Sequence, residues 1–162
     1  LIAARYAQRY GDTLTALVLS GPLVGEWAAA AQLLALPELP DAPLDIGTLS
    51  RDPAVGERYA ADPLVWHGPF KRPTLEAIER GLAAVLAGPS LGSLPVLWAH
   101  GGDDELVPVA GTRSGIEHLA GAGVVARIYP QARHEIFNET NADEVLADVT
   151  GFIEEAVRLR GS

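Results

Sequence analysis

The chain has 162 residues, of which 48% are hydrophobic and 20% are charged, a composition typical of a globular protein of one domain. The formal net charge of -9 argues against nucleic acid as a partner, because a phosphate backbone would repel the protein. The absence of cysteine excludes disulfides and thiolate metal sites, and the apolar runs are too short or too interrupted to cross a bilayer.

The amino-terminal region predicts a helix followed by a buried strand. Residues 1–10 place apolar side chains near one face and arginines on the other, and Gly11 ends the pattern. The run 14–19 is short and mostly apolar, as in the strands of a parallel sheet. The chain begins with Leu1 inside helix-like sequence, with no capping residue ahead of it, so we expect it to be part of a longer protein.

The sequence changes character between residues 23 and 93. Residues 23–36 are rich in alanine and leucine and predict a helix. A proline-rich loop follows, and Asp52 before Pro53 is typical of an N-cap with proline at the first helical position. Apolar residues at helical spacing between 75 and 86 predict a further helix. We interpret residues 23–93 as an inserted helical cap.

An alternation of strands and helices follows the cap. The runs 95–99 and 124–129 predict strands, residues 109–120 predict the helix between them, and a final helix is expected over 143–160. Alternating strands and helices with short connections indicate a parallel sheet, so we predict an α/β fold.

Two segments after these strands carry the strongest chemical signal. Asp104 lies in the segment 100–108, after the first strand, and His134 lies in the segment 132–139, after the second. The carboxyl ends of parallel strands meet at one edge of a sheet, where α/β proteins bind their ligands. A histidine there can act as a general base, and a carboxylate on its Nδ1 orients it. We therefore predict that Asp104 and His134 are two members of a Ser-His-Asp triad.

Neighbouring polar residues offer alternatives to this assignment. The turn pattern Gly-x-x-Asp-x-x-Val, over 101–107, selects Asp104 rather than Asp103. His100 is expected to pack behind the Asp104 loop. A metal site made of His100, Asp103, Asp104 and His134 is conceivable from its ligand types, but no helical histidine spacing supports one. We expect neither a metal nor a cofactor.

The nucleophile of such a triad is not found in the chain. A nucleophile elbow needs Gly-x-Ser-x-Gly between a strand and a helix, because only small residues tolerate the strained turn. Ser20 follows a strand and precedes Gly21, but Val18 stands where glycine is required. The other serines also fail this test; Ser90 has glycines at 88 and 92, but it lies between an expected helix and an expected strand. No His-Gly-x-Gly segment that would form an oxyanion hole occurs in the sequence either.

Four stretches of the chain together resemble one family. They are the run 1–7, the segment 50–55, the segment Asp-Pro-Leu-Val-Trp-His-Gly at 62–68, and the Asp104 and His134 segments. The chain resembles the carboxyl-terminal part of the monoacylglycerol lipases of the α/β-hydrolase fold, bacterial ones in particular. The resemblance covers essentially the whole chain. It implies a partial α/β-hydrolase domain over 1–162, with the carboxyl-terminal portion of the parallel sheet and residues 23–93 as the cap, or lid.

The resemblance also implies an activity. In the family the elbow is Gly-His-Ser-Met-Gly-Gly and runs into the helix that begins here at Leu1, so the serine is expected upstream of this chain. That serine would attack the ester of a monoacylglycerol or a similar lipid, while His134 takes and returns the proton and Asp104 orients His134. The 162 residues by themselves are then expected to be catalytically incomplete, with the missing amino-terminal portion of the same protein as a partner.

The apolar residues of the cap indicate where a lipid ester would bind. The residues expected to line a channel for the acyl chain are Leu23, Trp27, Ile46 and Leu49. The cap is also expected to touch a membrane surface, which would place the protein in the cytoplasm or at the periphery of a membrane. Two alternatives stay open: another capped serine hydrolase, such as a short-chain carboxylesterase or a lysophospholipase, and a non-catalytic lipid-binding module.

Overall fold

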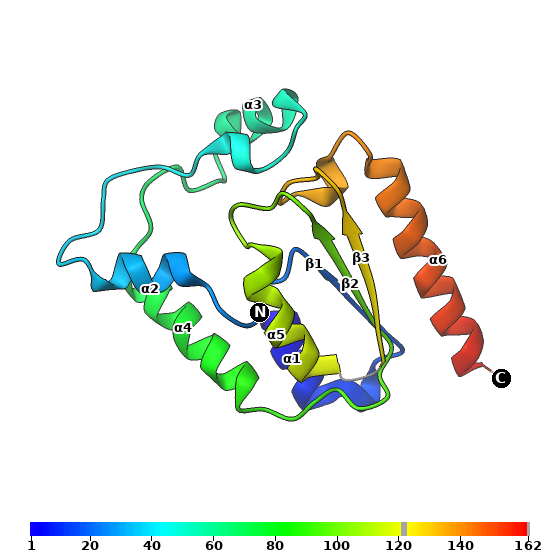
Figure 1. Cartoon of the computed structure of the whole chain (residues 1–162). Coiled ribbons are helices and arrows are strands. Elements are labelled where there is room, and N and C mark those ends of the chain that lie inside the picture. Colours follow the sequence, from blue (N-terminus) through cyan, green and yellow to red (C-terminus); the bar gives the residue numbers. More distant parts are fainter. Residues whose placement is uncertain (121–122, 162) are drawn as a thin grey trace.

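The computed structural model describes residues 1–120 and 123–161, which form a small parallel sheet with helices on both faces (Figure 1). Within these residues the sheet has the order β1-β2-β3, with β1 (Leu17–Ser20), β2 (Val96–Gly101) and β3 (Val124–Tyr129). Both pairings are parallel, which confirms the predicted α/β class. Gly101 pairs with Tyr129, so the loops that follow β2 and β3 leave the sheet at the same level.

The helices follow most of the predicted periodicity. The α-helices are α1 (Ile2–Tyr10), α2 (Ala28–Ala35), α3 (Pro53–Ala61), α4 (Arg72–Leu86), α5 (Val109–Ala120) and α6 (Ala142–Arg160). Short 3-10 turns are η1 (Gly11–Thr13), η2 (Ile46–Thr48) and η4 (Ile136–Asn138). The start of α3 is as predicted, because the carboxylate of Asp52 accepts the N–H of Ala54 and Pro53 stands in the first turn. In the described ranges, no helix is long and apolar enough to cross a membrane.

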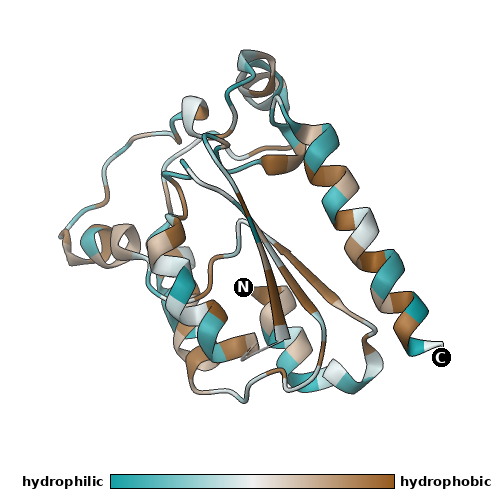
Figure 2. Ribbon diagram, turned by 45° about the vertical axis from the view of Figure 1, so that its right-hand side comes forward, coloured by the Kyte–Doolittle hydropathy of each residue, from teal (hydrophilic) through white to brown (hydrophobic). Residues whose placement is uncertain are grey.

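The side chains of β2 alternate between two core layers. Val96 and Trp98 cluster with residues of α1 and α5, whereas Leu97 and Ala99 cluster with residues of α6. Every residue of β2 is buried, as expected for the central strand of a sheet that is covered on both faces. Figure 2 shows the corresponding pattern along α6, where hydrophobic and hydrophilic bands alternate.

The helix predicted over 23–36 is wrong at its amino-terminal end, since α2 begins only at Ala28. Gly25 has a φ of 109°, which an L-residue in a helix does not adopt. The N–H of Glu26 donates to the carbonyl of Gly111 at 2.9 Å, and a Cβ on Gly25 would lie 2.4 Å from the same oxygen. This close contact with α5 holds the first residues of the segment out of the helix.

The predicted strand bounds also need correction. The strand expected over 14–19 is shorter at its start, because Leu17 lies opposite Val96, the first residue of β2, and the residues before Leu17 have no strand to pair with. The strand expected over 95–99 extends to Gly101, because β3 continues alongside it as far as Tyr129. The final helix begins at Ala142, one residue earlier than expected.

The segment 23–93 contributes to two different parts of the molecule. α3 and the loops around it stand at the carboxyl end of the sheet (Figure 1). α4 instead contacts α1 and α5, and its Val85 belongs to the same core cluster as Ala4 and Ala7. The stretch between α2 and α4 contacts the loop after β3, since the N–H of Glu135 donates to the carbonyl of Leu49.

Candidate active site

The loop after β2 is packed tightly against the loop after β3. The N–H of Gly102 donates to the carbonyl of Tyr129 at 2.8 Å, and the N–H of Asp103 donates to that of Ala132 at 3.0 Å. A Cβ on Gly101 would lie 2.1 Å from the carbonyl oxygen of Arg133, so only glycine allows this approach. The close contact of the two backbones brings Asp104 and His134 together.

The carboxylate of Asp104 is buried and fully hydrogen-bonded. Its Oδ1 accepts the backbone N–H groups of Leu106 at 3.0 Å and Val107 at 2.8 Å. Its Oδ2 lies 2.8 Å from Nδ1 of His134 and 3.1 Å from Nε2 of His100. Burial by itself raises the pKa of this carboxyl, but the hydrogen bonds from the two imidazoles and from Val107 outweigh it and hold the pKa far below its ordinary value. Asp104 is therefore a fixed anion.

The imidazole of His134 is held on one side and open on the other. Its Nδ1 carries the proton that is donated to Asp104, because a carboxylate can only accept. Among the described residues Nε2 has no hydrogen-bond partner, and the side chain is 30% exposed. The hydrogen bond to Asp104 raises the pKa of His134 above its ordinary value of 6.5, although burial opposes this effect.

Gly21 provides the space for this ring. It follows β1, has a φ of 48°, and donates its N–H to the carbonyl of Ala99 at 2.9 Å. A Cβ at this position would lie 3.3 Å from both Nδ1 and Cε1 of His134. The turn after β1 thus requires glycine both for its left-handed backbone and for contact with the imidazole.

His100 lies behind Asp104, as expected, but sequence reasoning missed its hydrogen bonds. Nδ1 of His100 accepts the indole N–H of Trp98 at 2.9 Å, so its proton is on Nε2. That nitrogen lies 2.7 Å from the carbonyl oxygen of Val107 and 3.1 Å from Oδ2 of Asp104. The available signal was the strand period, because Trp98 and His100 are two residues apart and share one face of β2.

The other polar candidates are not brought into this cluster. Asp103 is exposed, while its neighbour Asp104 is buried. His67 is hydrogen-bonded to the carbonyl of Asp62 at 2.9 Å, and its ring packs edge-on against Tyr59. Within the described ranges, no group of three or more histidine, aspartate or glutamate side chains is arranged to hold a metal ion.

The four apolar residues expected to bind substrate have different surroundings. The indole N–H of Trp27 donates to the carbonyl of Leu106 at 2.9 Å, in the Asp104 loop. Leu49 is only 2% exposed, and its carbonyl accepts the N–H of Glu135 beside His134. Ile46 is 39% exposed, and Leu23 is partly buried. Trp27 and Leu49 therefore contact the two loops of the site directly.

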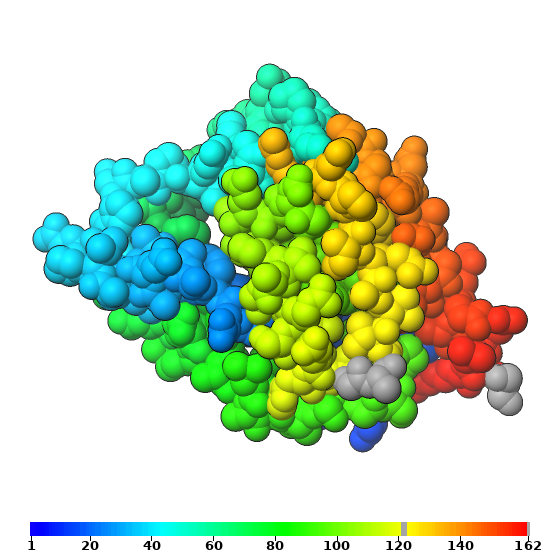
Figure 3. All heavy atoms as spheres, viewed as in Figure 1, coloured from blue at the N-terminus to red at the C-terminus, as the bar shows by residue number. Residues whose placement is uncertain are grey.

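A hollow lies between Trp27 and the start of α5. It has a volume of about 350 Å³ and is lined by Glu26, Trp27, Ala28, Ala29, Glu105, Leu106, Pro108, Ala110 and Gly111. Figure 3 shows this face of the molecule hollowed between the blue residues before α2 and the green residues around the start of α5. The hollow therefore borders the Asp104 loop on the side of residues 26–29.

The sequence of residues 1–141 matches the family described as serine aminopeptidase, S33. Over 171 aligned residues the chain is 36% identical to a monoacylglycerol lipase of Mycolicibacterium smegmatis, a match that covers 94% of this chain and 58% of that protein. The chain thus spans less than two thirds of the curated relative.

Solved structures of two lipases have a similar fold. The monoacylglycerol lipase of Paleococcus ferrophilus superposes with a TM-score of 0.77 at 24% identity, over 94% of this chain and 63% of that one. A soluble variant of the monoglyceride lipase from Saccharomyces cerevisiae, in complex with a substrate analog, has a TM-score of 0.77 at 20% identity. That match covers 96% of this chain and 58% of the yeast chain. At these identities the likeness establishes the shared α/β-hydrolase fold.

Proposed function

Since the chain belongs to the Hydrolase_4 family (serine aminopeptidase, S33) and is a monoacylglycerol lipase-like α/β hydrolase, we propose that it supplies His134 and Asp104 to the catalytic triad of a carboxylic ester hydrolase. The observation that carries the proposal is the 2.8 Å hydrogen bond between Nδ1 of His134 and Oδ2 of Asp104. It leaves Nε2 as the only imidazole nitrogen able to exchange a proton with a substrate or a nucleophile.

The proposed reaction has two proton transfers at Nε2 of His134. A serine hydroxyl gives its proton to Nε2 as its oxygen attacks the ester carbonyl, and the imidazolium then gives that proton to the leaving alcohol. Water hydrolyses the acyl-enzyme by the same two steps. Asp104, an anion throughout, stabilises the imidazolium and keeps the proton of the resting imidazole on Nδ1.

We place the nucleophilic serine outside these 162 residues. The Gly-x-Ser-x-Gly run at 88–92 follows α4 and precedes β2, so it is not the strand-to-helix elbow that a nucleophile needs. In the described part of the chain no serine hydroxyl is hydrogen-bonded to His134. The hydroxyl of Ser50, for example, donates to the carbonyl of Asn138 at 3.0 Å. The proposal therefore includes a further portion of the protein that supplies the serine and the oxyanion hole, and the chain alone hydrolyses no ester.

The proposed substrates are monoacylglycerols or similar lipid esters. The M. smegmatis relative is a monoacylglycerol lipase, and the hollow beside Trp27 could hold part of an acyl chain, with Leu23, Ile46 and Leu49 as further contacts. Leu64 and Trp66, in the loop between α3 and α4, are 93% and 60% exposed. Apolar side chains so exposed are suited to peripheral contact with a lipid surface.

A chimera tests the proposal. The 162 residues replace the matching part of the M. smegmatis monoacylglycerol lipase, which then supplies the serine. We expect hydrolysis of long-chain monoacylglycerols, at least a thousandfold loss with His134→Ala, and no turnover by the 162 residues alone.

The substrates tested also separate the alternatives. Faster hydrolysis of acetate esters or of lysophospholipids would assign a different ester class, and faster cleavage of aminoacyl anilides would assign a peptidase. A folded chimera that binds lipid vesicles but cleaves none of these substrates would contradict the enzymatic proposal.

A further inference from the structure

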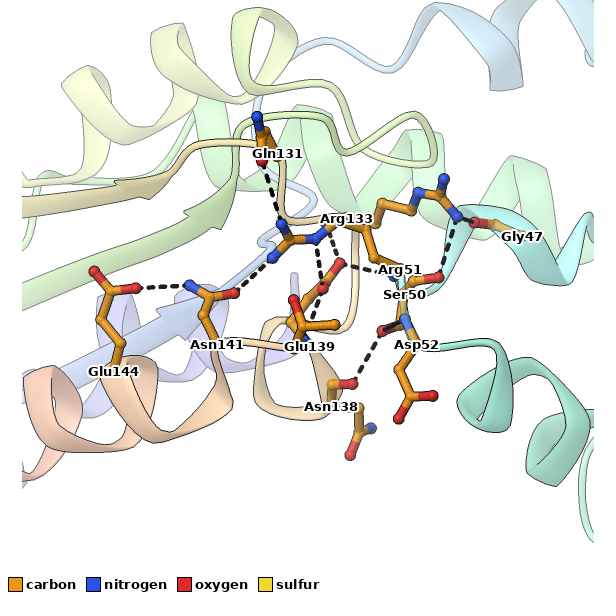
Figure 4. Close-up of polar contacts among 11 residues, drawn as sticks. Gly47, Ser50, Arg51, Asp52, Gln131, Arg133, Asn138, Glu139, Asn141 and Glu144 are labelled. Atoms are coloured by element: carbon orange, nitrogen blue, oxygen red, sulfur yellow. Dashed lines mark hydrogen bonds and ion pairs between the residues drawn. The ribbon is translucent and has the colours of Figure 1, made fainter.

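Two segments far apart in the sequence are joined at the carboxyl end of the sheet by a buried carboxylate (Figure 4). The side chain of Glu139, from the loop that carries His134, has no solvent exposure. Its Oε1 accepts the backbone N–H groups of Arg133 at 2.8 Å and Arg51 at 3.1 Å. Its Oε2 accepts Nε of Arg51 at 2.9 Å and the N–H of Thr140 at 3.0 Å. Arg51 belongs to the cap, so Glu139 connects the cap to the His134 loop.

Further bonds join the same segments, with donors on both sides. The hydroxyl of Ser50 donates to the carbonyl of Asn138 at 3.0 Å, and a second guanidinium nitrogen of Arg51 donates to the side chain of Asn141 at 2.9 Å. The guanidinium of Arg133 donates to the carbonyl of Ser50 at 3.1 Å and to that of Gly47. We call the segments 47–52 and 131–141, with these bonds, the cap clasp.

The cap clasp holds the backbone on both sides of His134. The N–H of Arg133 is bound by Glu139. The N–H of His134 itself donates to the carbonyl of Thr48 at 3.4 Å, and the N–H of Glu135 donates to that of Leu49 at 2.8 Å. Three consecutive backbone donors, with His134 at their centre, are thus satisfied by Glu139 and by the cap.

We propose that Glu139 and Arg51 are positioning residues that fix His134 against Asp104. A buried carboxylate with three backbone N–H donors and an arginine partner is held in one place, and loss of the carboxylate would leave these donors unpaired in the interior. Such a fixed anchor, five residues from His134, determines where the imidazole stands. The segment 47–52 is therefore part of the support of the base, and the cap does more than cover the substrate.

A purely structural role for this ion pair would have a different signature. It would lower the stability of the whole chain but leave His134 and Asp104 in the same contact in every molecule that stays folded. A positioning role changes that contact in the folded state. The state of the imidazole must therefore be measured separately from stability.

The experiment follows the ring protons of His134 by NMR in the 162-residue chain and in Glu139→Gln. Glutamine has the same size as glutamate, but its NH₂ group replaces one of the two carboxylate oxygens. That group cannot accept the two N–H donors that the lost oxygen binds. We expect the pKa of His134 to fall from its raised value toward 6.5 and its Nδ1 proton to exchange faster with water. His134→Gln assigns the resonances, and Glu155→Gln, at an exposed pair with Arg158, is the matched control.

A second variant keeps the test decisive if Glu139→Gln unfolds. Arg51→Lys retains a charge for Glu139 but cannot also reach Asn141, so we expect a smaller change in the same direction. An unchanged pKa and an unchanged Nδ1 proton in either folded variant would overturn the inference.

The catalytic meaning of the cap clasp rests on the proposed function. In the chimera with the M. smegmatis lipase, Glu139→Gln is expected to lower kcat by tenfold to about a hundredfold with little change in KM, because the base is misplaced and the substrate contacts are kept. If the chimera is inactive, the NMR result still decides whether Glu139 positions His134, so the two proposals fail independently.

Discussion

His100 and His134 both contact the same oxygen atom of Asp104, with Nε2 of His100 at 3.1 Å and Nδ1 of His134 at 2.8 Å. The other oxygen of this carboxylate is bound by two backbone N–H groups. Rotation of the Asp104 side chain would therefore break several hydrogen bonds at once. The carboxylate is held in one orientation by the protein itself, which is the preorganisation that the proposed triad requires.

Replacing Asp104 by asparagine is the most direct test of this lock. An NH₂ group in place of Oδ2 would face the N–H groups of His100 and His134 and could accept neither. His134 would then lose its hydrogen-bond partner. We expect the pKa of His134 to fall, and the free energy of unfolding to drop by about 3 kcal/mol, because a buried pair is broken. NMR titration and urea unfolding measure the two effects. Asp103→Asn, at the exposed neighbour, should change stability by less than about 0.5 kcal/mol; equal effects at both positions would argue against the assignment of Asp104.

The pair also predicts how stability depends on pH. The folded pKa of Asp104 is lowered, so its contribution is present above 3.8 and is lost as the pH falls toward the folded value. The folded pKa of His134 is raised, so its contribution is full below 6.5 and is lost as the pH rises through the folded value. The pair therefore stabilises the chain most between these two ordinary pKa values.

Urea unfolding at a series of pH values checks this expectation. The stability difference between the wild-type chain and His134→Gln should be largest near pH 5 and should shrink above pH 6.5. A difference that grows with rising pH would contradict the raised pKa of His134.

The role of Trp98 gives a third prediction. Trp98→Phe removes the N–H that is donated to Nδ1 of His100, and leaves a buried acceptor without its partner. We expect a loss of about 1–3 kcal/mol in the free energy of unfolding. The proton of His100 should stay on Nε2, because the carbonyl of Val107 and the carboxylate of Asp104 still accept from it. Trp66→Phe is the control, because its indole N–H donates to the carbonyl of Pro69 at an exposed position. An equal loss of stability in Trp98→Phe and Trp66→Phe would show that the buried bond to His100 adds nothing to the fold.

Much of the fold and the centre of the candidate site could be predicted from the sequence, because both depend on local pattern. The apolar run before Asp104 and the one before His134 predict parallel strands, and parallel strands bring their carboxyl ends together. The partner residues could not be predicted in the same way. Arg51 and Glu139 are 88 residues apart, and no periodicity connects them. The extended residues before α2 were missed because a tertiary contact of Gly25 with α5 overrides a helical composition.

Gly21→Ala provides the last test, since it crowds the imidazole of His134 without replacing any of its hydrogen-bond partners. The new methyl group would lie 3.3 Å from the ring, and alanine is strained at a φ of 48°. We expect a loss of about 1–2 kcal/mol in the free energy of unfolding from the strain, together with a shifted Cε1 proton resonance for His134. The matched control is Gly151→Ala in α6, where a Cβ meets nothing within 4 Å. That variant should gain up to about 1 kcal/mol, because alanine favours a helix over glycine. If Gly21→Ala is as stable as Gly151→Ala and leaves the His134 resonance in place, the turn after β1 does not shape the site. If only Gly21→Ala loses stability and shifts the His134 resonance, the loops after β1, β2 and β3 all help to position the same imidazole.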